Sequence, residues 1–404
     1  MLARAARNLA LSAVVVTMAH GADEPHVVVP PPATHGVFTQ FANIIECLQK
    51  NYVYPLHIGA DEHATAALRE FVRSLDPDAE LLTPDEVAVA NAPLSADVGD
   101  IGLSLTIRGD YPTVIAPRDG CPAQKAGLLA GDQIVAIDGQ STTRAHVFMV
   151  KNQLRGPIGS NVTLRVLDPV TSARRDVTIE RAADLPPSPA PLEFLGRSVV
   201  YFRVSEFTPA VLERLRAALQ HPRAQKARGL ILDLRNNPGG TFLVTLAAAR
   251  LFLYAKADIV ALEYSNPGLR TTFVSDAGEK FLAPMAVLVD GGTAGEAEIF
   301  AAALRDQKRA RLVGTKTFGR GRLISQFPLP DGSALLVPTA VYLPPSKHAF
   351  NDDGLTPDEA VSVPRETERI LSAMGFGSFN SAGGRSEALK TDPVLAHALE
   401  LLTK

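Results

Sequence analysis

The sequence predicts a multidomain α/β protein with an N-terminal helical region, a β-rich unit and a core built on a mainly parallel sheet. Three observations predict this fold class. At 404 residues the chain is longer than one ordinary domain. Near residue 95 the apolar pattern changes from helical spacing to short strands that end at glycines. Beyond residue 192 apolar strands alternate with amphipathic helices, which is typical of a parallel sheet covered by helices.

The composition excludes several classes of protein. Hydrophobic residues make up 46% of the chain and charged residues 21%, which favours folded cores over disorder. The formal net charge is −3 and the basic residues are scattered, so no basic stripe is available for phosphates and we expect no nucleic-acid partner. The nine histidines have no metal-ligand spacing, and we expect neither a metal nor a cofactor.

The first 21 residues predict a secretion signal. Arg4 and Arg7 precede an apolar run at 9–18, and Ala19 and Gly21 place small residues at the cleavage site. A membrane anchor is the alternative, but the run is much shorter than the ~20 residues that a spanning helix needs. We expect cleavage after Gly21, a periplasmic mature protein and no membrane span after cleavage.

Residues 37–92 predict an N-terminal helical region after a proline-rich linker at 22–36. Its second helix should end just before Pro77, because the residue before a proline disfavours helical backbone. Cys47 in this region and Cys121 beyond it are the two cysteines of the chain. An oxidising compartment permits a bridge between them, but we expect two separate buried thiols.

Residues 95–182 predict the β-rich unit. A glycine loop at 99–102 leads into a strand, a helical turn at 122–128 is closed by glycine, and a strand within 131–139 ends in a hairpin turn. With the alternating strand near 162–166, these motifs resemble a PDZ domain of the bacterial protease type.

The PDZ resemblance implies peptide binding. In such domains an extended peptide adds to a sheet edge and backbone amides capture its terminal carboxylate. Here those amides would belong to Ile101, Gly102 and Leu103. The alternative is that the unit serves only as a spacer or lid.

Residues 192–365 predict the α/β core, and residues 366–404 a C-terminal helical tail. A proline-rich stretch at 184–191 marks the boundary before the core. The strands and helices that we expect alternate along the chain at 199–204, 209–219, 229–234, 241–253, 285–289 and 296–304. Two glycine-rich turns, at 234–240 and 290–296, join a strand to a helix, where backbone N–H groups can converge on a negative charge.

From about residue 37 to the C-terminus the chain resembles the carboxyl-terminal processing peptidases. The motifs that carry the resemblance are the turn at 236–240, Thr317–Gly321, Gly354–Asp358 and Asp392–Leu399. The resemblance implies a serine-type peptidase that uses a serine–lysine dyad and no cofactor. It also implies an oxyanion hole formed by the backbone at Gly239, Gly240 and Glu296.

The same resemblance implies that the catalytic residues are replaced. The place of the nucleophilic serine is taken by Gly295, that of the general-base lysine by Arg320 and that of the orienting glutamine by Ile324. Arginine stays protonated because its pKa lies above ~12, and isoleucine forms no hydrogen bond. We therefore expect a non-catalytic protein that binds protein C-termini or unfolded, extended peptides.

Two alternatives remain open. One is an active serine-type endopeptidase with an unrecognised nucleophile, for which Thr293, Ser205 and Ser325 are candidates. The other is a scaffold that self-associates or regulates an active paralogue. For Arg320 two roles remain open: it holds a peptide carboxylate, or it pairs with Glu296.

Overall fold

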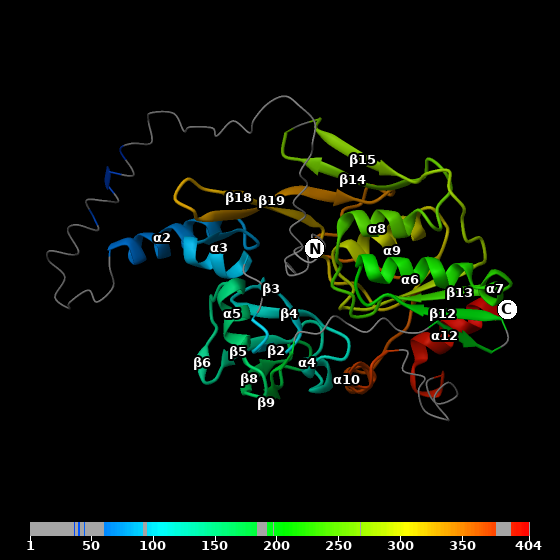
Figure 1. Ribbon diagram of the computed structural model, residues 1–404, viewed down its shortest axis with the longest axis horizontal. Helices are drawn as coiled ribbons and strands as arrows, with labels where there is room; N and C mark the ends of the chain where they lie inside the picture. Colours follow the sequence, from blue (N-terminus) through cyan, green and yellow to red (C-terminus); the bar gives the residue numbers. More distant parts are fainter. Residues whose placement is uncertain are drawn as a thin grey trace.

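The computed structural model describes residues 60–91, 95–183, 192–196, 198–266, 268–376 and 389–403, together with Gly36, Thr39, Gln40 and Ile44. The expected signal peptide, nearly all of the linker and Cys47 lie outside the described residues. The multidomain α/β fold class is confirmed (Figure 1). A β-rich unit lies beside a larger α/β core, and the N-terminal helices lie above that unit (Figure 1).

The core is built on a six-stranded sheet in the order β11-β12-β13-β16-β17-β20. All neighbouring strands are parallel except β11 and β12, as the sequence predicts. The strands are β11 (Glu193–Leu195), β12 (Val199–Arg203), β13 (Gly229–Asp233), β16 (Met285–Val289), β17 (Arg311–Gly314) and β20 (Glu359–Ala360). Every residue of β12, β13 and β16 is buried, because helices cover both faces of the sheet.

Helices cover the two faces of this sheet unequally (Figure 1). The larger apolar core lies under α6 (Pro209–Gln220), α8 (Phe242–Ala249) and α9 (Glu296–Asp306), with the short α7 (Pro222–Gln225) beside them. A smaller core lies under α12 (Pro393–Thr403) on the opposite face. The Thr208 hydroxyl accepts a hydrogen bond from Val211 N at 3.3 Å and caps α6.

The β-rich unit has an antiparallel sheet in the order β3-β4-β5-β8-β9, with β6 paired to β5, so β3 lies at an edge. A second small sheet has the order β10-β2-β7. The elements are β2 (Val98–Asp100), β3 (Leu103–Arg108), β4 (Tyr111–Pro117), α4 (Pro122–Lys125), β5 (Gln133–Ile137), β6 (Gln140–Ser141), α5 (Val147–Leu154), β7 (Gly156–Pro157), β8 (Asn161–Leu167), β9 (Arg174–Glu180) and β10 (Ala182–Ala183).

The N-terminal region contains a strand that the sequence did not predict. Between α2 (Ala60–Leu75) and α3 (Pro84–Asn91), β1 (Glu80–Leu82) pairs with β19 (Ala334–Leu343) near the other end of the chain. The same sheet contains β14 (Asp258–Tyr264), β15 (Arg270–Val274) and β18 (Arg322–Pro328). Residues that are remote in sequence thus form the wall above the β-rich unit.

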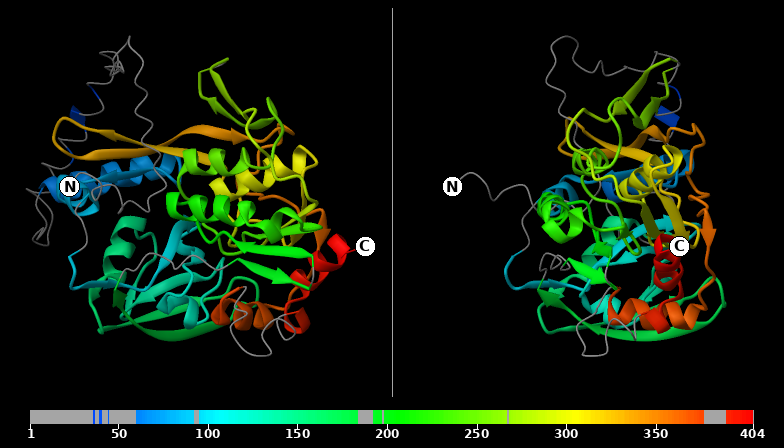
Figure 2. Two further views of the ribbon diagram at one scale, coloured as in Figure 1. Left: turned by 45° about the vertical axis from the view of Figure 1, so that its right-hand side comes forward. Right: turned by 90° about the vertical axis from the view of Figure 1, so that its right-hand side faces the viewer.

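The β-rich unit lies against the core (Figure 2). Ion pairs between charged side chains join the two units. Arg203 at the end of β12 contacts both carboxylate oxygens of Asp119, at 2.5 and 2.7 Å. Arg365, the first residue of α10 (Arg365–Met374), pairs with Asp132 at 2.9 Å. Because Arg203 and Asp132 are buried, loss of one partner would leave a charge without its counterion.

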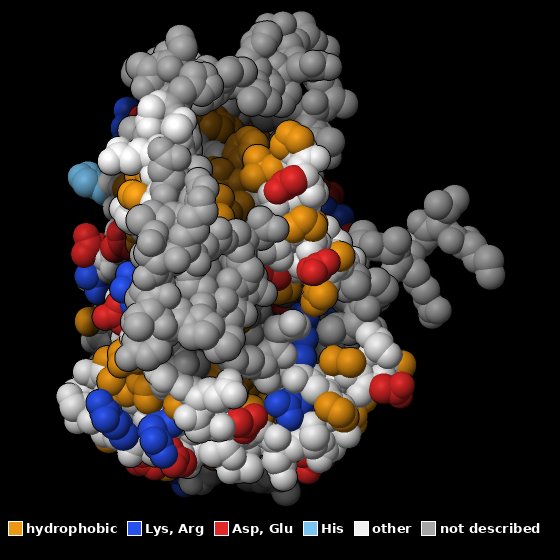
Figure 3. Space-filling model, turned by 90° about the vertical axis from the view of Figure 1, so that its left-hand side faces the viewer, with side chains coloured by type: hydrophobic (Ala, Val, Ile, Leu, Met, Phe, Trp, Pro, Cys, Tyr) orange, Lys and Arg blue, Asp and Glu red, His pale blue; other side chains and the backbone are white. Residues whose placement is uncertain are grey.

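The surface and the described helices show no membrane or metal signature. Figure 3 shows one face of the molecule, on which basic and acidic side chains are interspersed. Among the described residues, no helix is both long and apolar enough to cross a bilayer. Within those same residues, no group of His, Cys, Asp and Glu side chains is arranged to hold a metal ion.

Candidate functional site

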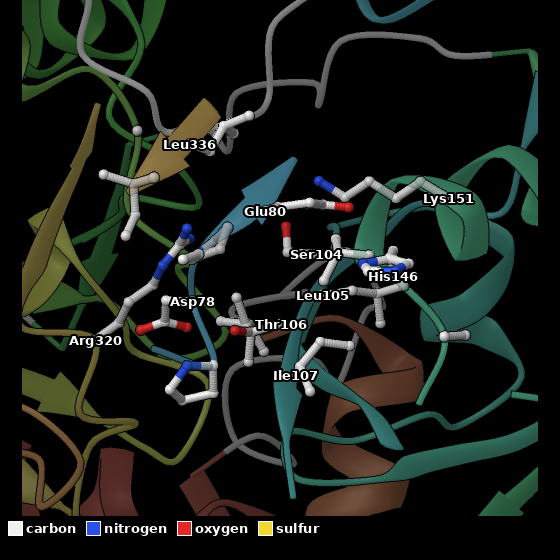
Figure 4. Close-up of a pocket in the computed structure, with 18 of the residues that line it drawn as sticks. Asp78, Glu80, Ser104, Leu105, Thr106, Ile107, His146, Lys151, Arg320 and Leu336 are labelled. Atoms are coloured by element: carbon white, nitrogen blue, oxygen red, sulfur yellow. The ribbon is translucent and has the colours of Figure 1, made fainter. Parts of the chain in front are cut away.

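A pocket of about 330 Å³ lies where the β-rich unit, the N-terminal region and the core meet (Figure 4). Its first wall is formed by β3 and α5, its second by the segment at 77–80, and its third by the core. The core residues that line it include Pro238, Gly240, Arg320 and Ile324. The edge strand of the β-rich unit and two of the positions expected from the catalytic motif thus share one cavity.

Gly295 lies at the sharp turn that begins α9. Its backbone has φ 58° and ψ −119°, a strained conformation that glycine adopts readily. A Cβ atom at this position would have Pro238 O as its nearest neighbour, at 3.6 Å, which is ordinary contact. The turn therefore has space for a small side chain, but any residue other than glycine would be strained at this positive φ.

Glu298 joins the two turns that carry the motif. Its carboxylate accepts hydrogen bonds from the amides of Gly295 at 2.9 Å and of Gly319 and Arg320 at 2.8 Å. The Thr317 hydroxyl donates to it at 2.5 Å. Burial raises the pKa of Glu298 to about 7, against the effect of these donors. The four bonds hold the backbone of position 320 next to the start of α9.

The Glu296 side chain binds a backbone amide, that of Gly240, which the family resemblance assigns to the oxyanion hole. Its Oε2 accepts a hydrogen bond from Gly240 N at 3.2 Å, and Tyr342 donates to its Oε1 at 3.4 Å. Gly239 N donates to Asn237 Oδ1 at 2.9 Å. Burial raises the pKa of Glu296, while the positive charge of Arg320 opposes that shift. In this structure both glycine amides are therefore bound to side chains of the chain itself.

Arg320 and Ile324 lie on the core wall of the pocket. Arg320 also lines a small recess with Gly295 and Glu296, so the structure brings the nucleophile and base positions of the motif together. Within the described part of the chain, the Arg320 guanidinium forms no ion pair; its contribution at Glu296 is electrostatic. Ile324 adds an apolar side chain at the start of the β18 wall.

The loop expected to bind a carboxylate lies at the start of β3. Ile101 is fully buried, and Gly102 N donates to Asp100 Oδ1 at 2.6 Å, so one expected amide already has a partner. Gly102 has φ +82°, and a Cβ there would lie 2.3 Å from Cys121 Cβ. Any substitution of Gly102 would therefore disturb its packing against Cys121. A Gly102 variant is for that reason unsuitable as a test of peptide binding. From Leu103 the chain continues along β3, whose residues at 104–107 line the pocket.

The sequence reasoning missed several ionisable residues of the pocket, among them Asp78, Glu80, His146 and Lys151 (Figure 4). Burial lowers the pKa of Lys151 to about 8, and the positive charge of Arg320 acts in the same direction. Glu80 Oε1 accepts a hydrogen bond from Phe148 N at 3.3 Å, in the first turn of α5. The one sequence signal for this cluster was Lys151 itself, which lies in α5 after the hairpin turn at 138–139.

Comparison with known proteins identifies both units. The profile of peptidase family S41 matches residues 198–361, and that of the PDZ domain matches residues 113–168. A carboxyl-terminal-processing protease of Synechocystis sp. is 35% identical over 309 residues, which cover 75% of this chain and 72% of the relative. The carboxy-terminal-processing protease of Bartonella bacilliformis is 31% identical over 340 residues, 82% of this chain and 76% of the relative.

Solved structures agree with the sequence comparison. A photosystem II D1 C-terminal processing protease superposes with a TM-score of 0.70 at 26% identity, covering 82% of this chain and 95% of that chain. A putative S41 protease from Bacteroides fragilis, with a TM-score of 0.50 at 19% identity over 89% of this chain and 96% of that chain, shares the fold. The chain therefore belongs to the carboxyl-terminal processing peptidases of family S41 and contains a PDZ domain.

Proposed function

We propose that this S41 protein is non-catalytic and binds protein C-termini or extended, unfolded peptides in its pocket. The observation that carries the proposal is Gly295 at the turn that begins α9, where the family places its nucleophile. A residue without a side chain cannot attack a peptide bond. Loss of the nucleophile costs about 10⁶ in turnover in a serine protease.

The neighbouring positions support the same conclusion. An arginine side chain does not act as a base in proteins, so position 320 offers no group to take a proton from a hydroxyl. Glu296 accepts the hydrogen bond of Gly240 N, a donor that would otherwise stabilise a developing oxyanion. Nucleophile, base and one oxyanion donor are thus each replaced or occupied.

Other hydroxyls near the site are engaged in hydrogen bonds. Thr293 Oγ1 donates to Leu234 O at 2.9 Å, and Ser325 Oγ is bonded to Thr339 Oγ1 at 2.6 Å. For the alternative of an active endopeptidase, the better-placed hydroxyl is Ser104, because it lines the same pocket as Lys151. A lysine with a lowered pKa is the kind of base that a serine nucleophile requires.

Features that bind peptides are retained. The edge of β3 faces the pocket and offers main-chain groups to an added strand. Arg320 brings a permanent positive charge and paired N–H donors to the core wall, suited to a carboxylate. Together with the predicted secretion signal, these features support a periplasmic protein that binds polypeptide ends. Regulation of an active paralogue, the other alternative, would instead appear as a changed cleavage rate of that paralogue.

The test combines cleavage and binding. Purified protein is incubated with an unstructured substrate that has an apolar C-terminus, and the products are analysed by mass spectrometry. Fluorescence anisotropy measures binding of the same C-terminal peptide with a free or an amidated end. We expect intact substrate and tighter binding of the free carboxylate.

Specific cleavage that persists in preparations free of host proteases would contradict the proposal. Labelling of Ser104 by a serine-directed probe, lost in Ser104→Ala, would establish the endopeptidase alternative. Equal binding of free and amidated peptides would show that the C-terminal carboxylate is not recognised.

A further inference from the structure

Two positively charged side chains enter the pocket from opposite walls. Lys151 comes from α5 of the PDZ domain, and Arg320 from the turn that precedes β18 of the core (Figure 4). Both are half-buried. Neither forms an ion pair within the described residues, whereas Asp78, which lies beside Arg320, pairs with Arg322 at 3.4 Å.

The two cations destabilise each other. Burial is the main cause that lowers the pKa of Lys151, and the charge of Arg320 is the next. The nearby Glu80 opposes this shift with a smaller effect. An anion between Lys151 and Arg320 would relieve both the repulsion and the cost of burying an unpaired charge.

The pocket already has carboxylates of its own, because Asp78, Glu80 and Glu206 line it, and of these three Glu80 acts on Lys151. Glu80 extends from β1 and accepts the hydrogen bond of Phe148 N at 3.3 Å. Burial raises the pKa of Glu80, which means that the buried environment disfavours the ionised form of this carboxylate. This carboxylate lines the pocket and comes from β1 of the N-terminal region.

A peptide added to β3 would present alternate side chains toward α5. On that face a side chain would meet His146, Val147 and Lys151. We propose that the pocket selects peptides with a carboxylate side chain near the C-terminus, held between Lys151 and Arg320, and that Glu80 competes for this position. The inference rests on the proposed peptide-binding function and names the chemistry of the peptide.

The experiment uses the full chain and fluorescent peptides in matched pairs. In each pair one of the last four residues is Glu or Gln, and the remaining sequence is neutral and identical. At pH 7 we expect the best Glu peptide to bind about tenfold more tightly than its Gln partner, as one charge-assisted contact implies. Lys151→Gln should bring this ratio close to one, while Lys151→Arg should preserve it.

Two further variants complete the design. Lys125→Gln removes the same charge from α4, where the side chain is exposed and lies outside the pocket, and should leave the ratio unchanged. Glu80→Gln keeps an acceptor for Phe148 N and should tighten binding of the Glu peptide by about threefold or more, with less effect on the Gln peptide. Thermal unfolding of each variant confirms that it is folded.

The outcomes separate the two proposals. Equal binding of Glu and Gln peptides at every position would overturn the selection and leave the proposed function standing. Binding of neither peptide would overturn the proposed function and this inference with it. A preference for Glu that survives in folded Lys151→Gln would show that Lys151 does not hold the carboxylate.

Discussion

The core half and the PDZ half of the pocket differ in which of their groups are free to contact a peptide. In the core half the motif backbone is held by Glu298, yet Gly295 has no side chain and Gly240 N is bound to Glu296. In the PDZ half the edge strand β3 faces the cavity, and Lys151 forms no ion pair with another described residue, although the charge of Glu80 acts on it. Catalysis depends on a few side chains, whereas strand addition depends on main-chain groups that tolerate substitution. Under the proposed function, peptide binding has persisted at a site that has lost its catalytic side chains.

The largest expected effect comes from restoring the core half. Gly295→Ser, Arg320→Lys and Ile324→Gln together should give measurable labelling by a serine-directed probe, because the turn has room for a serine. Adding Glu296→Ala frees Gly240 N and should raise the labelling rate by a further factor of about 10², the usual value of one oxyanion donor. Labelling is followed by intact-protein mass spectrometry.

Single substitutions serve as the control for this prediction. None of the four changes alone should give labelling, since nucleophile and base act as one unit. A folded quadruple variant without labelling would show that the turns have moved by ~1 Å or more from a productive geometry.

An intermediate effect is expected from separating the two halves. Asp119→Ala leaves Arg203 buried with only the 3.5 Å contact to Asp233, and should lower the free energy of unfolding by about 3 kcal/mol. Asp176→Ala removes a similar but exposed pair with Arg165, at 2.8 Å, and should change stability little. Chemical denaturation of both variants provides the measurement. Equal losses would mean that burial of the Arg203 pair is unimportant.

The smallest expected effect is the pH dependence of the PDZ half. Lys151, whose pKa is about 8, faces Arg320, Glu80, Arg155 and Asp100. A bound carboxylate raises that pKa, so the complex holds more protons than the free protein just above pH 8. The affinity for a Glu peptide should therefore fall between pH 7 and pH 9, by at most about tenfold for each pH unit. Anisotropy should show a flat profile for Lys151→Arg.

Much of the core fold could be predicted because each of its buried strands is a short apolar run that is recognisable from the local sequence alone. The run Met285–Val289 is apolar throughout and ends at a turn, and its predicted bounds agree with β16. The sheet of β1, β14, β15, β18 and β19 was not predicted. Strand β18 mixes Arg322, Ser325 and Gln326 with apolar residues, and its partner is set by tertiary contacts rather than by periodicity.

The site could be predicted only where spacing carried the information. Positions 295 and 320 followed from the resemblance to the processing-peptidase motifs, and the structure brings them to one recess. The contact between Glu296 and Gly240 depends on how one side chain folds back, which no spacing reveals. Lys151 and Glu80 come from different units, and their meeting depends on how β1 passes over α5.

The pairing of β1 with β19 has a consequence for the order in which the protein is made. Leu82 lies opposite Ala334, so β1, which forms one wall of the pocket, cannot pair until β19 has left the ribosome much later in synthesis. The PDZ domain is complete well before that point and can fold as a unit. A nascent or truncated chain would therefore present the β3 edge without the Glu80 strand fixed above it, and only the finished chain has the closed pocket.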